Sequence, residues 1–305
     1  MDRIGSPQNP SDALPSYVII SPVRDEEQYL PLTIASVCAQ RHHPLMWVLV
    51  DDGSRDGTAQ LIDDAAELYP WIRAVHRGDR GMRQAGTGVI DAFYAGYRQV
   101  AGTDHDYIVK LDGDLSFGPT YFEQCLSRMA NEPSLGIAGG TCCLLDEGVL
   151  VAEFPRDPTF HVRGPTKIYR RTCFEEIKGL VSAPGWDTID QMSANMLGWK
   201  TRTFADVMLR HHRPTGAAYG AWKDSMKCGL ANYVTGYHPA FMLCKCLLRM
   251  LRQPLRGGMR DGIGHLAGFA KGYVLRVPRT SNDRLISYVR NEQWRALTFR
   301  RSLWH

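Results

Sequence analysis

Between residues 17 and 111 the sequence alternates short apolar runs with segments of helical periodicity, and this alternation constrains the fold more than any other feature. The runs predict strands and the periodic segments predict helices. Strands are expected at residues 17–22, 46–50, 72–75 and 107–111, with helices at 30–40, 59–68 and 89–99 between them. Strands and helices that alternate at such short intervals form parallel sheets through right-handed crossovers. We therefore expect an α/β fold with a mostly parallel central sheet flanked by helices.

Carboxylates follow two of these expected strands. Asp51 and Asp52 come directly after the second strand, and Asp112 and Asp114 come after the fourth. Ligands of open parallel sheets bind outside the carboxyl ends of the strands. Hard cations such as Mg²⁺ and Mn²⁺ bind carboxylates together with substrate phosphates, and Gly113 lets a substrate approach the backbone closely. Taken alone, Asp-Gly-Asp after a strand is more often a plain turn, so a metal site here depends on its neighbours.

A glycine-rich and basic segment, residues 77–88, precedes the third expected helix. Its glycines are too frequent for a helix interior, so we expect a loop. One interpretation is a phosphate cradle built from backbone N–H groups and Arg83, and the other is a solvated loop.

Four features in this order resemble the inverting glycosyltransferases of family 2, which have the GT-A fold. They are Pro22-Val23-Arg24-Asp25-Glu26, Asp51-Asp52-Gly53-Ser54, the loop at 77–88, and Asp112-Gly113-Asp114. The resemblance extends over about residues 16–215. Asp25 stands where the family usually has Asn. The GT-A fold is Rossmann-like, in agreement with the expected sheet.

The resemblance implies a nucleotide-diphosphate-sugar donor and a Mn²⁺ or Mg²⁺ cofactor. Asp51 and Asp52 would recognise the base, and Asp112 and Asp114 would face the ribose and the metal-bound diphosphate. The acceptor would be a glycan or a lipid-linked molecule, as in the synthesis of cell-surface polysaccharides or glycolipids. The residues implied to bind the donor are Pro22, Arg24, Glu26, Asp51, Asp52, Arg83, Asp112 and Gly113.

The family also places a Glu-Asp pair about three turns before the glycine at the end of a later helix. Asp187 stands in the register of that aspartate, and Trp186 replaces the glutamate. Inverting transfer needs a base that takes the proton of the acceptor hydroxyl. An aspartate at the start of a helix also commonly serves as an N-cap. The family register favours Asp187 as the base, with Asp190 as the reserve candidate.

Two histidines follow the strand expected at 201–209. An isolated histidine is normally a structural or surface residue. Many family members supply a late histidine to the metal, so the resemblance implies that His211 or His212 is a third ligand beside Asp112 and Asp114.

Three arginines are further candidates for contacts with diphosphate or acceptor. Arg213 follows the two histidines, and Arg170 and Arg171 end an earlier segment where the family has paired basic residues. Guanidinium groups bind phosphate oxygens in a bidentate manner. Packing at the surface is the alternative role of Arg170 and Arg171.

The C-terminal segment is strongly basic. Residues 241–305 hold 13 Lys and Arg against 3 Asp and Glu, although the whole chain has a net charge of only +4. An amphipathic helix is expected at 241–252, with Lys245, Arg249 and Arg252 as a cationic stripe, and a second helix at 263–277 has glycine at every fourth position. The pair is either a helical hairpin packed on the core or an interfacial anchor, and the charge favours contact with an anionic membrane surface through 241–279. No nucleic-acid-binding motif is present, and the high Leu, Met and Phe content fits a membrane better.

These features divide the chain into a disordered tail (1–15), a GT-A domain (16–225) and a helical basic region (226–305). No run of 18 apolar residues is present, so we do not expect a membrane span. The eight cysteines form no CxxC pair, and the N-terminus has no signal-peptide pattern. We expect a cytoplasmic protein with reduced thiols, peripheral on the inner face of the cell membrane.

Two other classes of function remain open from the sequence. A haloacid-dehalogenase-like phosphatase also ends a strand in Asp-x-Asp, but its nucleophile normally follows the first strand of the core, whereas an extended α/β pattern precedes Asp112. A non-catalytic nucleotide-sugar-binding or membrane-scaffolding protein is the other class, and Trp186 in place of the family glutamate is the feature that supports it.

Overall fold

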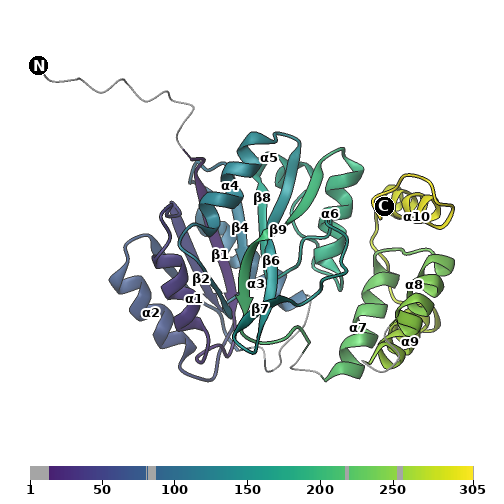
Figure 1. The fold of residues 1–305 in the computed structure, drawn as a ribbon. Helices are drawn as coiled ribbons and strands as arrows, with labels where there is room; N and C mark the ends of the chain where they lie inside the picture. Colours follow the sequence, from purple (N-terminus) through teal and green to yellow (C-terminus); the bar gives the residue numbers. More distant parts are fainter. Residues whose placement is uncertain (1–13, 80, 82–86, 217–219, 253–256, 305) are drawn as a thin grey trace, which may run out of the picture.

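A computed structural model of the protein describes residues 14–79, 81, 87–216, 220–252 and 257–304. Its centre is a nine-stranded sheet in the order β3-β2-β1-β4-β8-β6-β9-β5, with β7 paired to β6 (Figure 1). The strands are β1 Tyr17–Val23, β2 Met46–Asp51, β3 Ile72–His76, β4 Tyr107–Leu111, β5 Leu115–Phe117, β6 Leu135–Asp146, β7 Val149–Ala152, β8 Thr166–Arg170 and β9 Lys200–His211. The four strands expected from the N-terminal pattern, β1 to β4, pair in parallel.

The second half of the sheet is mixed rather than parallel. β8 runs antiparallel between β4 and β6, and β5 runs antiparallel to β9, whereas β6 and β9 are parallel. The short strand β5 lies between β4 and the helix that begins at Tyr121. The antiparallel direction of β8 decides which of its two ends lies near the candidate site.

Helices cover both faces of the sheet because the side chains of each strand alternate. In β1, Tyr17 and Ile19 face one core and Val18 and Ile20 face the other. The first core is covered by α1 Leu30–Cys38, α2 Thr58–Leu68 and α4 Tyr121–Asn131; the second is covered by α3 Thr87–Val100, α5 Arg171–Glu176 and α6 Trp186–Met196.

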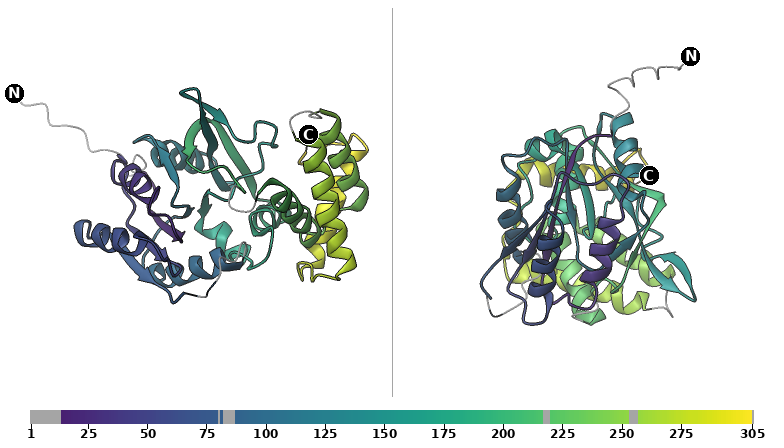
Figure 2. Two further views of the ribbon diagram at one scale, coloured as in Figure 1. Left: turned by 90° about the horizontal axis from the view of Figure 1, so that it is seen from below. Right: turned by 90° about the vertical axis from the view of Figure 1, so that its left-hand side faces the viewer.

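A helical region follows β9 and packs against α6, on the side of the molecule away from α1 and α2 (Figures 1 and 2). Its helices are α7 Ala221–Val234, α8 Pro239–Arg252, α9 Gly258–Val274 and α10 Asp283–Leu297. The glycines of α9 allow close contact with α7: a β-carbon at Gly268 would lie 1.9 Å from the Met226 carbonyl oxygen. A third apolar core joins these helices to Ile189 and Met192 of α6.

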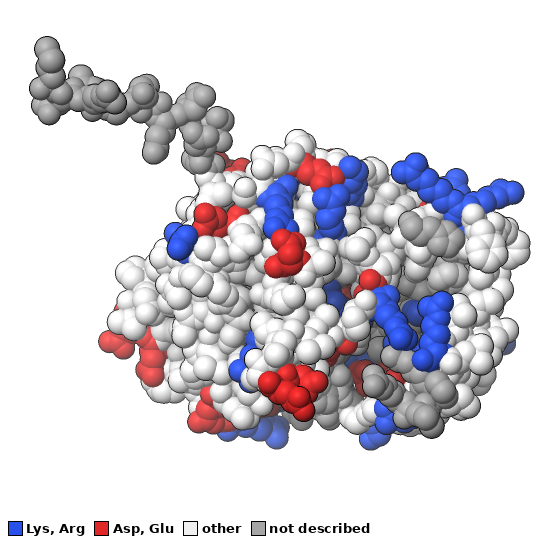
Figure 3. Space-filling model, viewed as in Figure 1, with Lys and Arg blue, Asp and Glu red and all other residues white. Residues whose placement is uncertain are grey.

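Among the described residues, none of the helices combines the length and the apolar character needed to cross a bilayer. All eight cysteines carry free thiols. Lys and Arg side chains gather over the helical region, at the right of Figure 3, while Asp and Glu lie mainly over the α/β part.

Candidate active site

The carboxyl ends of β1, β2 and β4 meet at one edge of the sheet, as parallel pairing requires. Val23 is the register partner of Asp51, and the Asp52 amide donates a hydrogen bond of 2.9 Å to the Val23 carbonyl. Pro22 lies inside β1, opposite Val50, and is buried, so its contribution to the site is structural. The chain segments after these three strands therefore form a common surface.

The turn after β2 is held in a fixed shape. The Asp51 carboxylate accepts a hydrogen bond of 2.8 Å from the Ser54 amide. Gly53 has φ = 75°, and a β-carbon there would lie 2.5 Å from Cα of Asp79, so only glycine fits the turn against the neighbouring loop. The Asp52 carboxylate accepts a hydrogen bond of 2.7 Å from Arg77.

Arg24 joins this turn to the loop after β3. Its guanidinium donates to the Asp52 carbonyl at 2.9 Å and to the Asp79 carboxylate at 2.8 Å. Arg55 donates to the other Asp79 oxygen at 2.8 Å. Arg24 is thus placed at the predicted donor edge. Asp79 and Arg77 belong to the same network, although no sequence motif marks either of them.

The strongest charge cluster surrounds Asp114. His211 Nε2 lies 3.5 Å from Asp114 Oδ2, and Arg213 lies 3.2 Å from the same oxygen. His211 Nδ1 lies 2.9 Å from the carboxylate of Glu153, and Arg213 also binds Glu26. The structure therefore brings together four predicted residues and adds Glu153, which no motif marks.

Electrostatics inside this cluster favour the charged forms. Burial disfavours charge on His211, but Asp114 and Glu153 outweigh it and raise its pKa to about 10. Burial alone would raise the pKa of Asp114, but His211 and Arg213 hold it below the usual range. The cluster is thus a paired set of charges at the sheet edge.

The two histidines have different roles. His211 reaches Asp114, whereas His212 Nε2 lies 2.5 Å from the Ser116 hydroxyl and its ring stacks on Tyr29. Pairing with β5 fixes this choice, because His211 is the register partner of Leu115. Of the two histidines that the sequence left open, His211 is the one that lies against the Asp114 carboxylate.

Asp114 and His211 provide geometry that suits a divalent cation. Neighbouring ligand atoms of one ion are separated by about 3 Å, close to the spacing observed here between Asp114 Oδ2 and His211 Nε2. Glu153 binds the opposite ring nitrogen, the arrangement that orients metal-binding histidines. Within the described ranges no group of three or more His, Cys, Asp or Glu side chains could hold an ion, so further ligands would have to come from substrate or water.

Asp112 lies at the end of β4 and is less buried than Asp114. Its carboxylate is bound by Lys110, and its amide donates to the Pro165 carbonyl at 2.8 Å. Gly113 packs against β1: a β-carbon there would lie 2.7 Å from Val23 Cγ1. Contact with Val23 therefore explains why position 113 has no side chain, in addition to the close approach of a substrate that we expected from the sequence.

The two candidate bases of α6 have different environments. Asp190 is buried, and its oxygens accept hydrogen bonds from Lys167, both at 2.8 Å, and from the Tyr169 hydroxyl at 2.5 Å. Burial raises the pKa of Asp190, and Lys167 opposes this rise. Asp187, in the first turn, is partly exposed and lies beside Gly164, where a β-carbon would be 3.4 Å from its Oδ2. Asp190 is therefore enclosed by hydrogen-bond donors, whereas the Asp187 side chain is accessible to solvent.

Two arginines that were predicted to contact diphosphate or acceptor lie at the edge of the sheet opposite to Asp112. Because β8 is antiparallel to β4, Arg170 is opposite Tyr107, at the amino end of β4, and binds carbonyl oxygens of Met129 and Leu135. Arg171 pairs with Asp104 and Glu175 on the surface. Their assignment to diphosphate or acceptor is corrected on this ground, since strand direction carries them away from Asp112.

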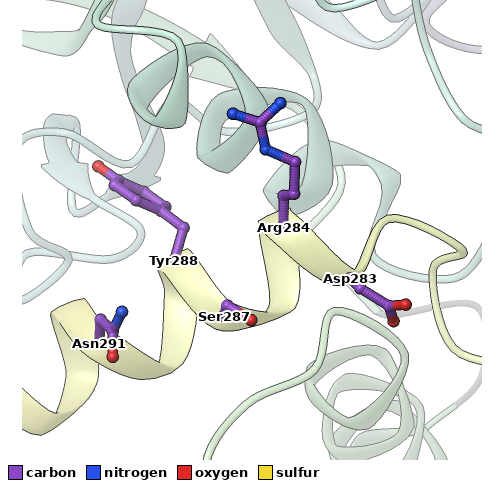
Figure 4. A pocket seen from close by; sticks show the side chains of 5 residues that line it. All are labelled: Asp283, Arg284, Ser287, Tyr288 and Asn291. Carbon is purple, nitrogen blue, oxygen red and sulfur yellow. The ribbon is translucent and has the colours of Figure 1, made fainter.

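Arg83, the remaining donor candidate, lies outside the described residues. A hollow of about 440 Å³ on the outer face of α10 is separate from the charge cluster (Figure 4). All five lining residues come from that one helix: Asp283, Arg284, Ser287, Tyr288 and Asn291.

Comparison with known proteins finds relatives of the α/β part. Residues 18–143 match the model of glycosyl transferase family 2. The chain is 35% identical over 106 residues to an undecaprenyl-phosphate 4-deoxy-4-formamido-L-arabinose transferase of Pseudomonas fluorescens (strain Pf0-1), covering 33% of this chain and 28% of that protein. It is 30% identical over 148 residues to the polyprenol monophosphomannose synthase of Mycolicibacterium smegmatis, covering 45% and 52% respectively. The chain thus spans about a quarter to a half of these relatives.

Solved structures show the same fold. The mannosyltransferase PcManGT from Pyrobaculum calidifontis, in complex with GDP-Man and Mn²⁺, superposes with a TM-score of 0.56 at 16% identity, over 95% of this chain and 82% of that one. GalNAc-T7 with UDP, GalNAc and Mn²⁺ superposes with a TM-score of 0.54 at 13% identity, over 67% and 44%. The fold is GT-A, as expected, and the phosphatase alternative has no support.

Proposed function

We propose that the chain, whose residues 18–143 match the model of glycosyl transferase family 2, is an inverting, divalent-cation-dependent enzyme that transfers a sugar from a nucleotide-diphosphate-sugar donor. One observation carries this proposal: Asp114 and His211 lie together at the sheet edge, with Glu153 behind the histidine. Such an edge suits a diphosphate and its metal ion.

The donor would lie across the carboxyl ends of the parallel strands. Asp51 and Asp52 would face the base from the rigid turn after β2, with Arg24 holding that turn to the loop after β3. Asp112, partly exposed, would bind the ribose. Arg213, already between Glu26 and Asp114, would donate to diphosphate oxygens.

Mn²⁺ or Mg²⁺ would be held by Asp114 and His211, with Asp112 alongside. When bound, the cation would neutralise charge that develops on the departing diphosphate. The solved structures of PcManGT and GalNAc-T7 are complexes with Mn²⁺, which supports the same cofactor class here.

Asp187 would take the proton of the acceptor hydroxyl. Its carboxylate lies beside Gly164, and the adjacent Pro165 carbonyl is bonded to the Asp112 amide, so the two aspartates flank one segment. Asp190 does not suit this role, because Lys167 and Tyr169 occupy its oxygens.

The acceptor would be lipid-linked or a glycan, and the names of the two curated relatives favour a polyprenyl phosphate. If the acceptor atom is a phosphate oxygen, it needs little help from a base, so the effect of removing Asp187 distinguishes the two acceptor classes.

The helical region, which begins with α7 at Ala221, would bring the preceding GT-A domain to a membrane surface through 241–279. α8 exposes an arc of leucines, with Leu251 exposed to 77%. Lys245 and Arg252 are exposed beside this arc, but Arg249 turns inward and binds His265 at 3.2 Å, so the expected stripe of three cations is reduced to two. α9 adds the exposed Met259, Ile263 and Val274. An apolar arc flanked by cations suits an anionic bilayer surface.

The test is a transfer assay. The protein would be incubated with UDP-glucose, UDP-GlcNAc or GDP-mannose and undecaprenyl phosphate, with Mn²⁺ or with EDTA. We expect a glycolipid in the presence of Mn²⁺ and none with EDTA. Absence of both transfer and donor hydrolysis, despite donor binding by calorimetry, would instead favour a non-catalytic binding protein.

Asp187→Asn tests the base. With a hydroxyl acceptor we expect the transfer rate to fall by about 10²–10⁴-fold, with donor affinity retained. Asp283→Asn, which changes an exposed aspartate in the first turn of α10, is the matched control and should leave the rate unchanged. Equal rates of the Asp187 variant and the wild type with a hydroxyl acceptor would remove Asp187 from this role.

A further inference from the structure

Two lysines are buried side by side beneath the candidate site. Lys110 of β4 and Lys167 of β8 are register partners, with exposures of 2% and 0%. The Trp186 ring covers both, with its centroid 5.4 Å from one ammonium nitrogen and 5.5 Å from the other. Like charges opposite one another on neighbouring strands destabilise a sheet, and a buried charge is costly unless it is paired. Each lysine is accordingly matched by one carboxylate.

The Lys167 pair is closed to solvent. Asp190 is 2% exposed, and both its oxygens are bound by Lys167, which also donates to the Asp187 carbonyl at 2.5 Å. The Tyr169 hydroxyl adds a further donor. These groups have almost no contact with solvent, and the pair joins α6 to the sheet.

The ion pair between Lys110 and Asp112 is partly exposed on the donor side. The Asp112 side chain is 29% exposed, and Lys110 donates to it and, at 2.8 Å, to the carbonyl of Gly164. The Asp112 amide in turn holds Pro165. Lys110 therefore contacts both the donor edge and the segment that lies against Asp187.

We propose that Lys110 is a positioning residue that fixes the Asp112 carboxylate and the Gly164 carbonyl together, and so couples the donor edge to the acceptor side. The role rests on the proposed function, because it supposes that Asp112 binds the donor. Lys110 itself touches no reacting atom. Trp186 stands where the family has a glutamate. Its ring covers the ammonium groups of both lysines at a position that would otherwise carry a second carboxylate.

The experiment compares Lys110→Met with Lys167→Met, since the two lysines share a strand pair and a tryptophan but serve different carboxylates. UDP, GDP and CDP would be titrated with Mn²⁺ by calorimetry, and thermal unfolding measured in parallel. For Lys110→Met we expect about tenfold weaker nucleotide binding with a melting temperature near wild type. For Lys167→Met we expect a lower melting temperature, with wild-type affinity below the transition. Lys110→Arg, which keeps the cation and its donors, should restore affinity to within about threefold.

A double-mutant cycle with Asp112→Asn tests whether Lys110 acts through Asp112. We expect the double variant to bind the nucleotide no more weakly than the worse single variant. Additive losses, wild-type affinity of Lys110→Met, or a loss of fold as large as that of Lys167→Met would each overturn the inference. Absence of nucleotide binding by the wild type would overturn the proposed function as well, so the two failures are distinguishable.

Discussion

The α/β part and the helical region differ in their buried charges and in the size of their most exposed apolar surfaces. In the α/β part, charges are buried in pairs, as in Lys167 with Asp190 and His211 with Asp114. In the helical region, large apolar side chains are exposed, and Leu251 and Val274 are exposed to 77% and 79%. Buried paired charge suits a polar ligand, whereas exposed apolar surface suits a nonpolar phase. The contrast agrees with one part that handles a charged donor and another that faces lipid.

A buried histidine in each region shows the same difference. In the α/β part, His211 lies between two carboxylates, which raise its pKa to about 10. In the helical region, His265 is buried near Arg249 and Lys245, and burial followed by these cations lowers its pKa to about 4. The neighbours therefore favour protonated His211 and neutral His265 at pH 7, and a metal ion bound at His211 would have to displace the proton of Nε2.

Asp114→Asn should have the largest effect. It removes the carboxylate shared by His211 and Arg213, and we expect sugar transfer to fall by at least about 10³-fold in single-turnover assays with Mn²⁺. Asp206→Asn, an exposed carboxylate on β9 that pairs with Arg128, is the control and should change the rate by less than about twofold. Wild-type rates in the Asp114 variant would show that the cluster is structural.

Asp190→Asn should lower the stability of the folded protein. Lys167 would keep a buried charge without its carboxylate, and we expect the free energy of unfolding to fall by about 3–5 kcal/mol. Urea unfolding measures this change. Asp187→Asn, on the same helix but partly exposed, should cost less than about 1 kcal/mol, and equal losses in the two variants would contradict the division of roles.

The helical region should lose stability in acid because of His265. Its pKa in the folded protein is about 4 and about 6.5 in the unfolded chain, so the unfolded state binds more protons as the pH falls from 6.5 to 4. Stability should therefore fall over that window, by about 3 kcal/mol in total. Asp261, whose carbonyl accepts from the ring, and Arg249 and Lys245 face the same group. His265→Gln should flatten the profile measured by chemical unfolding, and an unchanged slope would contradict the assignment.

The exposed leucines should matter for membrane binding alone. Leu247→Glu with Leu251→Glu should weaken co-sedimentation with phosphatidylglycerol vesicles by at least about 30-fold, since each of the two apolar side chains buried in lipid contributes on the order of 1–2 kcal/mol and about 1.4 kcal/mol corresponds to a factor of ten. The melting temperature should not change, because both positions are exposed. Leu68→Glu on α2, also exposed, is the control and should bind vesicles like the wild type. Equal binding to neutral and anionic vesicles would remove the electrostatic part of the proposal.

Local patterns were sufficient for much of the fold. Each apolar run from 17 to 111 became a strand within a residue or so of its expected end, and the helices between them formed where the spacing predicted. Asp112 and Asp114 reached the sheet edge because a parallel strand delivers whatever follows it to that edge. The fold class and the carboxylate-bearing edge of the sheet could therefore be predicted from neighbours in the chain.

Long-range pairing decided the rest. Pairing of β9 with β5 selected His211 over His212, and the reversed direction of β8 moved Arg170 and Arg171 away from the site. Glu153 had no sequence signal, because it follows the β6–β7 hairpin at no recognisable spacing from His211. Lys110 was hidden in an apolar strand, because its contacts with the Gly164 carbonyl and the Trp186 ring form only in the folded chain.

The sequence by itself thus determined the α/β core, its carboxylate-bearing edge and the basic helical end, because periodicity and turn residues act over a few positions. Only the tertiary structure decided which aspartate of α6 is buried, which histidine meets Asp114 and which face of α8 is left exposed. Those outcomes depend on the partners that strands and helices find far along the chain, and no local pattern encodes them.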